Sequence, residues 1–221
     1  MAITTKKNGM QSSDYALNSD TLVWWTTPIL RRKCVGADSV NILLKKEILR
    51  RAELDAGLQK SNVGGWHSGE DLLTWRIPGI DKLQRWIVEA FNDLTAATSN
   101  NQKFHGKLEL NAWANLNRKG DYNSVHTHPA CVWSGVYYVE SGDPPNMDYP
   151  KSGSLELLDP RAGTEMSAIP GALAGMQKNI HPSSGEIIVF PSWLKHHVHP
   201  YFGTGNRISI AFNVRIRNKN Q

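Results

Sequence analysis

The first half of the chain contains two segments in which apolar residues recur at the spacing of one helix face. The first predicted helix starts at an N-cap of Asp38 or Ser39 and runs to about Leu54. The second runs from Asp81 to about Thr98, and its apolar stripe comprises Ile80, Leu83, Ile87, Ala90, Phe91 and Leu94. Upstream, Thr21–Leu30 is rich in β-branched and aromatic residues and predicts a strand. Residues 1 to about 20 are polar, which predicts a flexible tail.

From Lys107 onward the pattern changes to short alternating segments separated by turn residues. The predicted strands are Leu108–Asn117, Trp133–Glu140, Gly153–Leu158, Gly185–Phe190 and Arg207–Arg215. In the last of these, the odd positions, which are polar apart from Ala211, alternate with apolar residues at even positions. Two helices followed by many short strands favour a mainly β fold with an N-terminal α region, a double-stranded β-helix (jelly roll) backed by helices.

The same pattern sets the expected domain limits. A flexible tail at 1–20 precedes a single jelly-roll domain at 21–221, with helical support over about 38–98 and a jelly-roll core over about 107–216. The chain has 221 residues, which is enough for one sizeable core.

Composition and charge exclude several classes of protein. Only two cysteines are present, Cys34 and Cys131, so a disulfide scaffold is excluded. No stretch of 18 apolar residues occurs, and no apolar leader segment precedes the domain, so we expect a cytoplasmic protein without membrane contact. The net charge of +5 comes from scattered basic pairs, and we find no base-stacking or strand-binding signature, so nucleic acid is not an expected partner.

The distribution of histidines indicates a metal site. Six of the eight histidines lie in the second half of the chain, at positions 126, 128, 181, 196, 197 and 199. Two residues apart on a strand, His126 and His128 point the same way and can reach one metal ion. His196 follows an apolar strand and a Pro-Ser-Trp corner, and Arg207 opens the next strand eleven residues later. Together these residues form one metal-site pattern.

At these residues the sequence resembles the Fe(II)/2-oxoglutarate-dependent oxygenases of the prolyl-hydroxylase-like branch. It is most similar to a group of small oxygenases of this type found in bacteria and phages. The resemblance covers roughly residues 60–216, and the matching segments are 64–68 (GGWHS), 123–129 (NSVHTHP), 134–139 (SGVYYV), 159–161 (DPR), 190–198 (FPSWLKHHV) and 207–213 (RISIAFN).

The resemblance implies a set of site residues. His126, His128 and His196 would be the catalytic metal ligands, with Fe(II) as the metal and 2-oxoglutarate as co-substrate. Arg207 would anchor the distal carboxylate of 2-oxoglutarate, a geometry that suits the guanidinium fork. The remaining expected co-substrate residues are Ser209, Tyr138, Asn117 and Asn213, and Asn115 is a further candidate pocket residue.

The expected metal site differs from the superfamily pattern in one ligand. His128 stands where a carboxylate usually completes the facial triad, so either the site has three histidines or another group completes it. The ordinary pKa of imidazole is about 6.5, so a three-histidine site predicts loss of activity below about pH 6.5. For the distal ligand, His196 fits the family's His-x-Val pattern, whereas His197 should face the opposite way and His199 should lie at the rim or contact substrate.

The implied function is a non-haem Fe(II)- and 2-oxoglutarate-dependent dioxygenase that hydroxylates a small molecule or peptidyl side chain, releasing succinate and CO₂. Its partners would be that substrate and O₂, and a homodimer is left open. One alternative is a three-histidine cupin dioxygenase that does not use 2-oxoglutarate, because Gly120, His126 and His128 match the first cupin motif apart from its glutamate. Another is a non-enzymatic metal-binding jelly roll.

Overall fold

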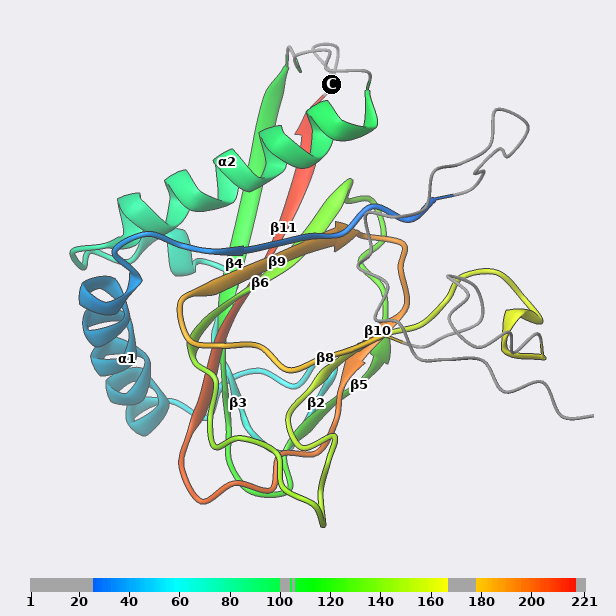
Figure 1. The fold of residues 1–221 in the computed structure, drawn as a ribbon. Helices are drawn as coiled ribbons and strands as arrows, with labels where there is room; N and C mark the ends of the chain where they lie inside the picture. The colour runs from blue at the N-terminus through cyan, green and yellow to red at the C-terminus, as the bar shows by residue number, and fades with distance from the viewer. Residues whose placement is uncertain (1–25, 100–103, 105, 167–177, 218–221) are drawn as a thin grey trace, which may run out of the picture.

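The computed structural model describes residues 26–99, 104, 106–166 and 178–217 (Figure 1). Its helices and strands, with two 3₁₀ turns (η), occur in the order β1 (Leu30–Lys33), α1 (Ala37–Leu54), β2 (Asn62–Val63), β3 (Trp66–His67), η1 (Leu72–Thr74), α2 (Ile80–Thr98), β4 (Lys107–Asn117), β5 (Tyr122–His126), β6 (Trp133–Glu140), β7 (Leu155–Leu157), η2 (Thr164–Met166), β8 (Lys178–Ile180), β9 (Glu186–Pro191), β10 (His196–Val198) and β11 (Arg207–Arg217). The predicted tail at 1–20 lies outside the described residues.

The strands form two antiparallel sheets. The six-stranded sheet has the order β1-β9-β6-β11-β4-β3, and the five-stranded sheet has the order β2-β5-β10-β7-β8. Both helices cover the outer face of the larger sheet, as Figure 1 shows. The fold is therefore the expected jelly roll backed by helices.

Alternation along the strands divides the core into two layers. In β11, Ile208, Ile210, Phe212 and Val214 pack toward the helices, together with Tyr137 of β6. The next residue of β6, Tyr138, faces the other way and packs between the two sheets with Leu155, Leu157, Ile188, Phe190 and Leu194. The polar residues of β11, which alternate with these apolar ones, consequently point into the space between the sheets.

One glycine allows the larger sheet to pack closely. A Cβ atom on Gly135 would lie 2.3 Å from the Phe212 ring and 2.7 Å from the carbonyl oxygen of Ile188. Since real Cβ atoms do not approach backbone so closely, this position on β6 accepts only glycine without rearrangement.

The first strand and the first helix begin at other residues than the pattern predicts. Of the predicted strand Thr21–Leu30, residues 21–25 lie outside the described residues and 26–29 have no regular structure. β1 starts only at Leu30, where pairing with Val189 of β9 begins, and Pro28 has no N–H to donate to a ladder. The cap of α1 is Gly36, with φ of 69°, so Asp38 and Ser39 lie within the first helical turn.

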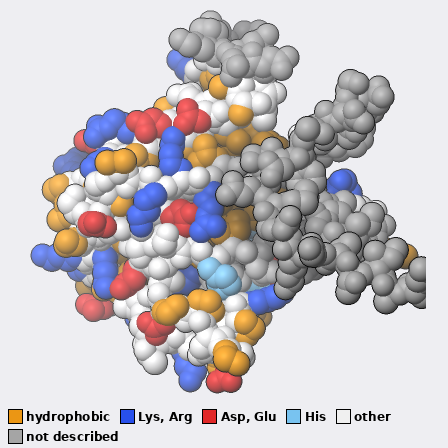
Figure 2. Space-filling model, in the orientation of Figure 1, with side chains coloured by type: hydrophobic (Ala, Val, Ile, Leu, Met, Phe, Trp, Pro, Cys, Tyr) orange, Lys and Arg blue, Asp and Glu red, His pale blue; other side chains and the backbone are white. Residues whose placement is uncertain are grey.

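On the face viewed in Figure 2, basic and acidic side chains are interspersed without a continuous basic patch. Neither α1 nor α2, the two α-helices of the described residues, has the length and hydropathy needed to cross a bilayer.

Candidate active site

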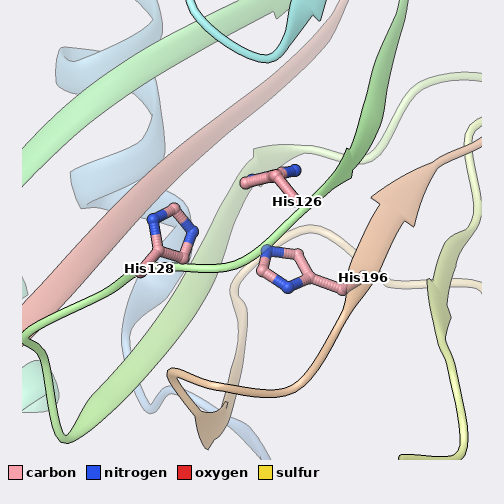
Figure 3. Close-up of side chains that lie close together, drawn as sticks. All are labelled: His126, His128 and His196. Carbon is pink, nitrogen blue, oxygen red and sulfur yellow. The ribbon is translucent and has the colours of Figure 1, made fainter.

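Three histidines converge between the sheets at the ends of two neighbouring strands (Figure 3). His126 is the last residue of β5, and His196, the first residue of β10, pairs directly with it across the antiparallel ladder. Their ring centroids are 4.3 Å apart, and the His128 ring lies 4.9 Å from that of His126 and 5.2 Å from that of His196. One nitrogen from each ring lies within 4.8 Å of the other two, so a single metal ion can reach all three. We call these residues the three-histidine cluster.

His128 reaches the cluster by a different route from the predicted one. The sequence pattern places it on the same strand as His126, but β5 ends at His126. The backbone N–H of His128 instead donates to the carbonyl oxygen of Ser192, 2.9 Å away, which ties the segment after β5 to the corner after β9. The shared direction of the two rings thus comes from this cross-connection and not from strand alternation.

Backbone carbonyls orient two of the three rings. The Nδ1 atom of His126 lies 2.7 Å from the carbonyl oxygen of Ser124, and Nδ1 of His196 lies 2.8 Å from that of Leu194. Because a carbonyl oxygen can only accept, each neutral ring carries its proton on Nδ1 and leaves Nε2 free as a candidate ligand atom.

Burial keeps these histidines in the neutral form that binds metals. It lowers the pKa of His196 to about 3 and that of His128 to about 4, and mutual repulsion within the cluster adds to both shifts. Burial also lowers the pKa of His126. All three imidazoles are therefore neutral at pH 7, and the sequence-based expectation of protonation near pH 6.5 moves to lower pH.

A second group of polar residues lies farther along the same space between the sheets. Arg207 is 1% exposed, its Nε donates to the carbonyl oxygen of Gly153 at 3.0 Å, and its guanidinium carbon lies 5.3 Å from the ring centroid of Tyr138. The strand register places Arg207 opposite Asn117, and Ser209 opposite both Asn115 and Tyr138. The sequence-predicted co-substrate residues other than Asn213 are thus neighbours at one end of the sheet.

Several polar atoms in this group have no partner among the described residues. They are Nη2 of Arg207, Oη of Tyr138, and the Oδ1 atoms of Asn115 and Asn117. Burial lowers the pKa of Arg207 and raises that of Tyr138, and the interaction between the guanidinium and the phenol opposes both shifts. A buried cation without an anionic partner is costly, so a small carboxylate fits this position chemically.

One cavity joins the two groups. It is lined by His126, His128 and His196 at one side and by Arg207, Ser209 and Asn115 at the other. Leu155, Phe190 and Val198 supply apolar lining. We call it the inner cavity.

A second, more open pocket reaches the three-histidine cluster from outside. This surface pocket shares Ser61, Trp113, His126 and His128 with the inner cavity and is otherwise lined by Lys60, His67, Glu70, Asn111, Thr127, Pro129, Cys131, Asn213 and Arg215. The His67 ring stacks on Trp113 with centroids 5.5 Å apart, and Trp113 lies 5.7 Å from His128. Sequence reasoning missed His67 as a pocket residue, although the matching segment 64–68 contains it.

Three further candidate residues, Asn213, His197 and His199, lie outside the group around Arg207. Asn213 contacts His128 and Ser134 and is six residues from Arg207 along β11. His197 and His199 face away from the three-histidine cluster and contact Glu156.

Comparison with known proteins agrees with this geometry. Residues 111–213, somewhat less than half of the chain, match the family model described as "Putative 2OG-Fe(II) oxygenase". The resemblance to the 2OG-Fe(II) oxygenases is confirmed. Fe(II) and 2-oxoglutarate, the cofactors expected from the sequence, are those in the name of this oxygenase family. No curated protein matches the chain significantly.

Solved structures of two prolyl hydroxylases and of HygX share the fold. A prolyl-4-hydroxylase from Pseudomonas putida is 18% identical, with a TM-score of 0.61 over 87% of this chain and 95% of the other. HygX from Streptomyces hygroscopicus, solved with nickel and 2-oxoglutarate, is 13% identical, with a TM-score of 0.58 over 86% of this chain and 83% of the other. The collagen prolyl hydroxylase of Paramecium Bursaria Chlorella virus-1 is 16% identical, with a TM-score of 0.51 over 86% of this chain and 96% of the other.

Proposed function

We propose that this chain is a non-haem Fe(II)- and 2-oxoglutarate-dependent dioxygenase that hydroxylates a small molecule or a peptidyl side chain, with release of succinate and CO₂. The observation that carries the proposal is the inner cavity. It joins a cluster of three neutral histidines to a buried arginine that has an unpaired donor. A 2-oxo dicarboxylic acid has the two ends that such a cavity needs, one to chelate a metal and one to pair with a guanidinium.

Each residue has a stated task in this proposal. His126, His128 and His196 hold the metal through nitrogen atoms, and Arg207 and Tyr138 donate hydrogen bonds to the distal carboxylate. With 2-oxoglutarate bound, Fe(II) supplies the activation of O₂ for C–H hydroxylation. The apolar side chains of the inner cavity keep bulk water away from the co-substrate.

The substrate would approach from the surface pocket. This pocket shares His126 and His128 with the inner cavity, so a metal held by them faces both spaces. Its lining combines the aromatic face of Trp113 with Lys60, Glu70 and Arg215, and charges of both signs suit a polar or zwitterionic group. Free amino acids and prolyl peptides are the first substrates to test.

The test uses purified protein loaded anaerobically with Fe(II). Adding 2-oxoglutarate should produce the charge-transfer absorption of a chelated Fe(II)–2-oxo acid, and admitting air should yield succinate, faster with a productive substrate. His196→Ala should abolish both signals. His181→Ala, which removes an exposed histidine outside both pockets, should leave both unchanged.

Two results would contradict the proposal. Oxygen-dependent turnover of a substrate without 2-oxoglutarate would instead indicate the three-histidine cupin chemistry. Stoichiometric Fe(II) binding with no spectral response to 2-oxoglutarate would indicate a metal-binding jelly roll.

A further inference from the structure

A second cluster of metal-binding side chains lies on the opposite face of the five-stranded sheet. Glu156 is the middle residue of β7, between two leucines that pack into the core between the sheets, so its side chain points to the other face. His197 is the middle residue of β10 and pairs directly with Glu156 in the register. His199 follows one residue beyond the strand. We call Glu156, His197 and His199 the second cluster.

The candidate ligand atoms of the second cluster lie almost close enough to one another to share one metal ion. Nε2 of His199 lies 2.6 Å from Oε2 of Glu156, and Nε2 of His197 lies 3.7 Å from Oε1. The two rings have centroids 4.6 Å apart, and the three candidate ligand atoms lie within 4.8 Å of one another. Ligand atoms about 2.0–2.2 Å from a shared metal can be at most about 4.4 Å apart, so small side-chain rotations suffice.

The strands and their hydrogen bonds hold these residues in place. Glu156 is 3% exposed, and the backbone N–H of His199 donates to the carbonyl oxygen of Ser154 at 3.0 Å. The side chains of His197 and His199 are 19% and 21% exposed, so an ion can reach their Nε2 atoms from solvent. Ligands on paired strands lose little entropy when they bind a metal.

We propose that Glu156, His197 and His199 form a second metal site that binds a divalent transition-metal ion, with Zn²⁺ as the probe that its ligands suit best. Once the nearby Lys151 ammonium has moved away, two neutral imidazoles and one carboxylate carry a net charge of −1, whereas the three-histidine cluster is neutral, so the second cluster then attracts a divalent cation more strongly. Without metal, His199 and Glu156 are joined directly by a hydrogen bond of 2.6 Å between Nε2 and Oε2.

Lys151 competes with the metal. Its Nζ atom lies 3.3 Å from Oε2 of Glu156, and its side chain is 50% exposed. The ammonium therefore balances the buried carboxylate in the metal-free protein and can swing into solvent when an ion arrives. The site ties β7 to β10 and has no equivalent of the buried Arg207, so its role is to stabilise the fold and not to catalyse.

The experiment counts Zn²⁺ ions in tag-free protein, by calorimetric titration and by metal analysis after dialysis. Wild type should bind two ions per chain. His196→Ala, which disables the three-histidine cluster, should bind one, and His196→Ala combined with His197→Gln and His199→Gln should bind none. In the His196→Ala background, Zn²⁺ should raise Tm, Glu156→Gln should abolish this rise, and His181→Gln should preserve it.

A variant that should bind Zn²⁺ more tightly is also needed, because a loss of binding could result from misfolding. Lys151→Ala in the His196→Ala background removes the competing ammonium from a half-exposed position, and Zn²⁺ should bind several-fold more tightly. If His196→Ala binds no Zn²⁺, or if Lys151→Ala leaves the affinity unchanged, the proposal is wrong. Because these measurements use a chain without His196, they do not depend on the proposed dioxygenase activity.

Discussion

The carboxamide of Asn213 faces the Nδ1 atom of His128 across 3.4 Å. The other end of the same amide lies 2.6 Å from Oγ of Ser134. A histidine that binds metal through Nε2 must carry its proton on Nδ1, and that proton needs an acceptor. In the structure, Nδ2 of Asn213 faces the ring and Oδ1 accepts from Ser134. Metal binding by His128 through Nε2 therefore requires this amide to turn over, so that its oxygen faces the ring and its NH₂ group donates to Ser134.

This arrangement predicts opposite effects of two substitutions at position 213. Asn213→Asp supplies an acceptor and should keep Fe(II) affinity at or above the wild-type value. Asn213→Leu has similar volume but no acceptor, and it should weaken Fe(II) binding by about 10- to 100-fold. Titration of both variants with Fe(II) under anaerobic conditions checks this. Equal affinities in the two variants would mean that His128 does not bind metal through Nε2.

If Arg207 anchors the co-substrate as proposed, Arg207→Lys should raise the apparent KM for 2-oxoglutarate about tenfold or more, because a single ammonium would replace the guanidinium fork. The value of kcat at saturating co-substrate should change much less, since the substitution is remote from the metal. Steady-state succinate assays give both numbers. An unchanged KM would show that the co-substrate is anchored elsewhere.

Gly153→Ala tests the support beneath Arg207. Gly153 has φ of 63°, its carbonyl oxygen accepts from Nε of Arg207, and a Cβ atom there would lie 3.2 Å from Cδ of Arg207. We expect a several-fold rise in KM for 2-oxoglutarate. Gly163→Ala is the matched control, because Gly163 also has positive φ but meets nothing within 4 Å. Both variants bear the backbone strain of about 1 kcal/mol, so a KM effect confined to Gly153→Ala reports the crowding of Arg207 and of Tyr201, whose ring would lie 3.1 Å from the added Cβ.

The pH dependence of the stability of the metal-free protein should follow the lowered pKa values of its buried imidazoles. The pKa of His128 is about 4 and that of His196 about 3, both below the ordinary value of 6.5. The unfolded chain therefore binds more protons between about pH 6.5 and 3, so the stability that these two neutral imidazoles contribute is full above pH 6.5 and is lost as the pH falls through that window. Imidazole NMR titrations of the metal-free protein should place His128 near pH 4. A midpoint near 6.5 would contradict the neutral cluster.

The two cysteines should differ sharply in reactivity. Burial raises the pKa of the Cys34 thiol to about 11, whereas Cys131 lines the surface pocket and accepts a hydrogen bond from Nε of Arg215. Iodoacetamide at neutral pH should modify Cys131 and spare Cys34 until the protein unfolds. Alkylation should also slow substrate-stimulated succinate release, and Cys131→Ser should remove that sensitivity. Peptide mass spectrometry reports the sites, and comparable labelling of both thiols would disprove the difference.

The sequence pattern predicts those elements whose periodicity extends over many residues. The stripe of α2 and the alternation of β11 are both confirmed, because each buries one continuous face. The two- and three-residue strands β2, β3 and β8 have no period to detect and are defined only by the strands they pair with. The same holds for β1, which starts where β9 offers a partner and not where strand propensity is highest.

The sequence predicts which residues belong to the candidate site but not how these residues are arranged in space. The combination of motifs and the family resemblance indicate that His126 and His196 approach one another, and the register places them in direct opposition. The position of His128 depends on a backbone hydrogen bond to Ser192, and the stacking of His67 on Trp113 joins residues 46 positions apart. Contacts between such distant segments leave no trace in local periodicity.

The consecutive placement of His196 and His197 gives β10 tolerance to one particular register error. A slip of one residue turns every side chain of a strand to the opposite face, and the pairing of β10 with β5 is already irregular between His196 and Val198. If β10 moved back by one position, His197 would replace His196 beside His126, and Val198 would take the place opposite Glu156. The interior would keep its third imidazole, whereas the opposite face would lose both His197 and His199, because they lie two residues apart and turn together. This one-residue misalignment would therefore leave the inner cluster with three histidines but would remove both imidazoles of the second cluster.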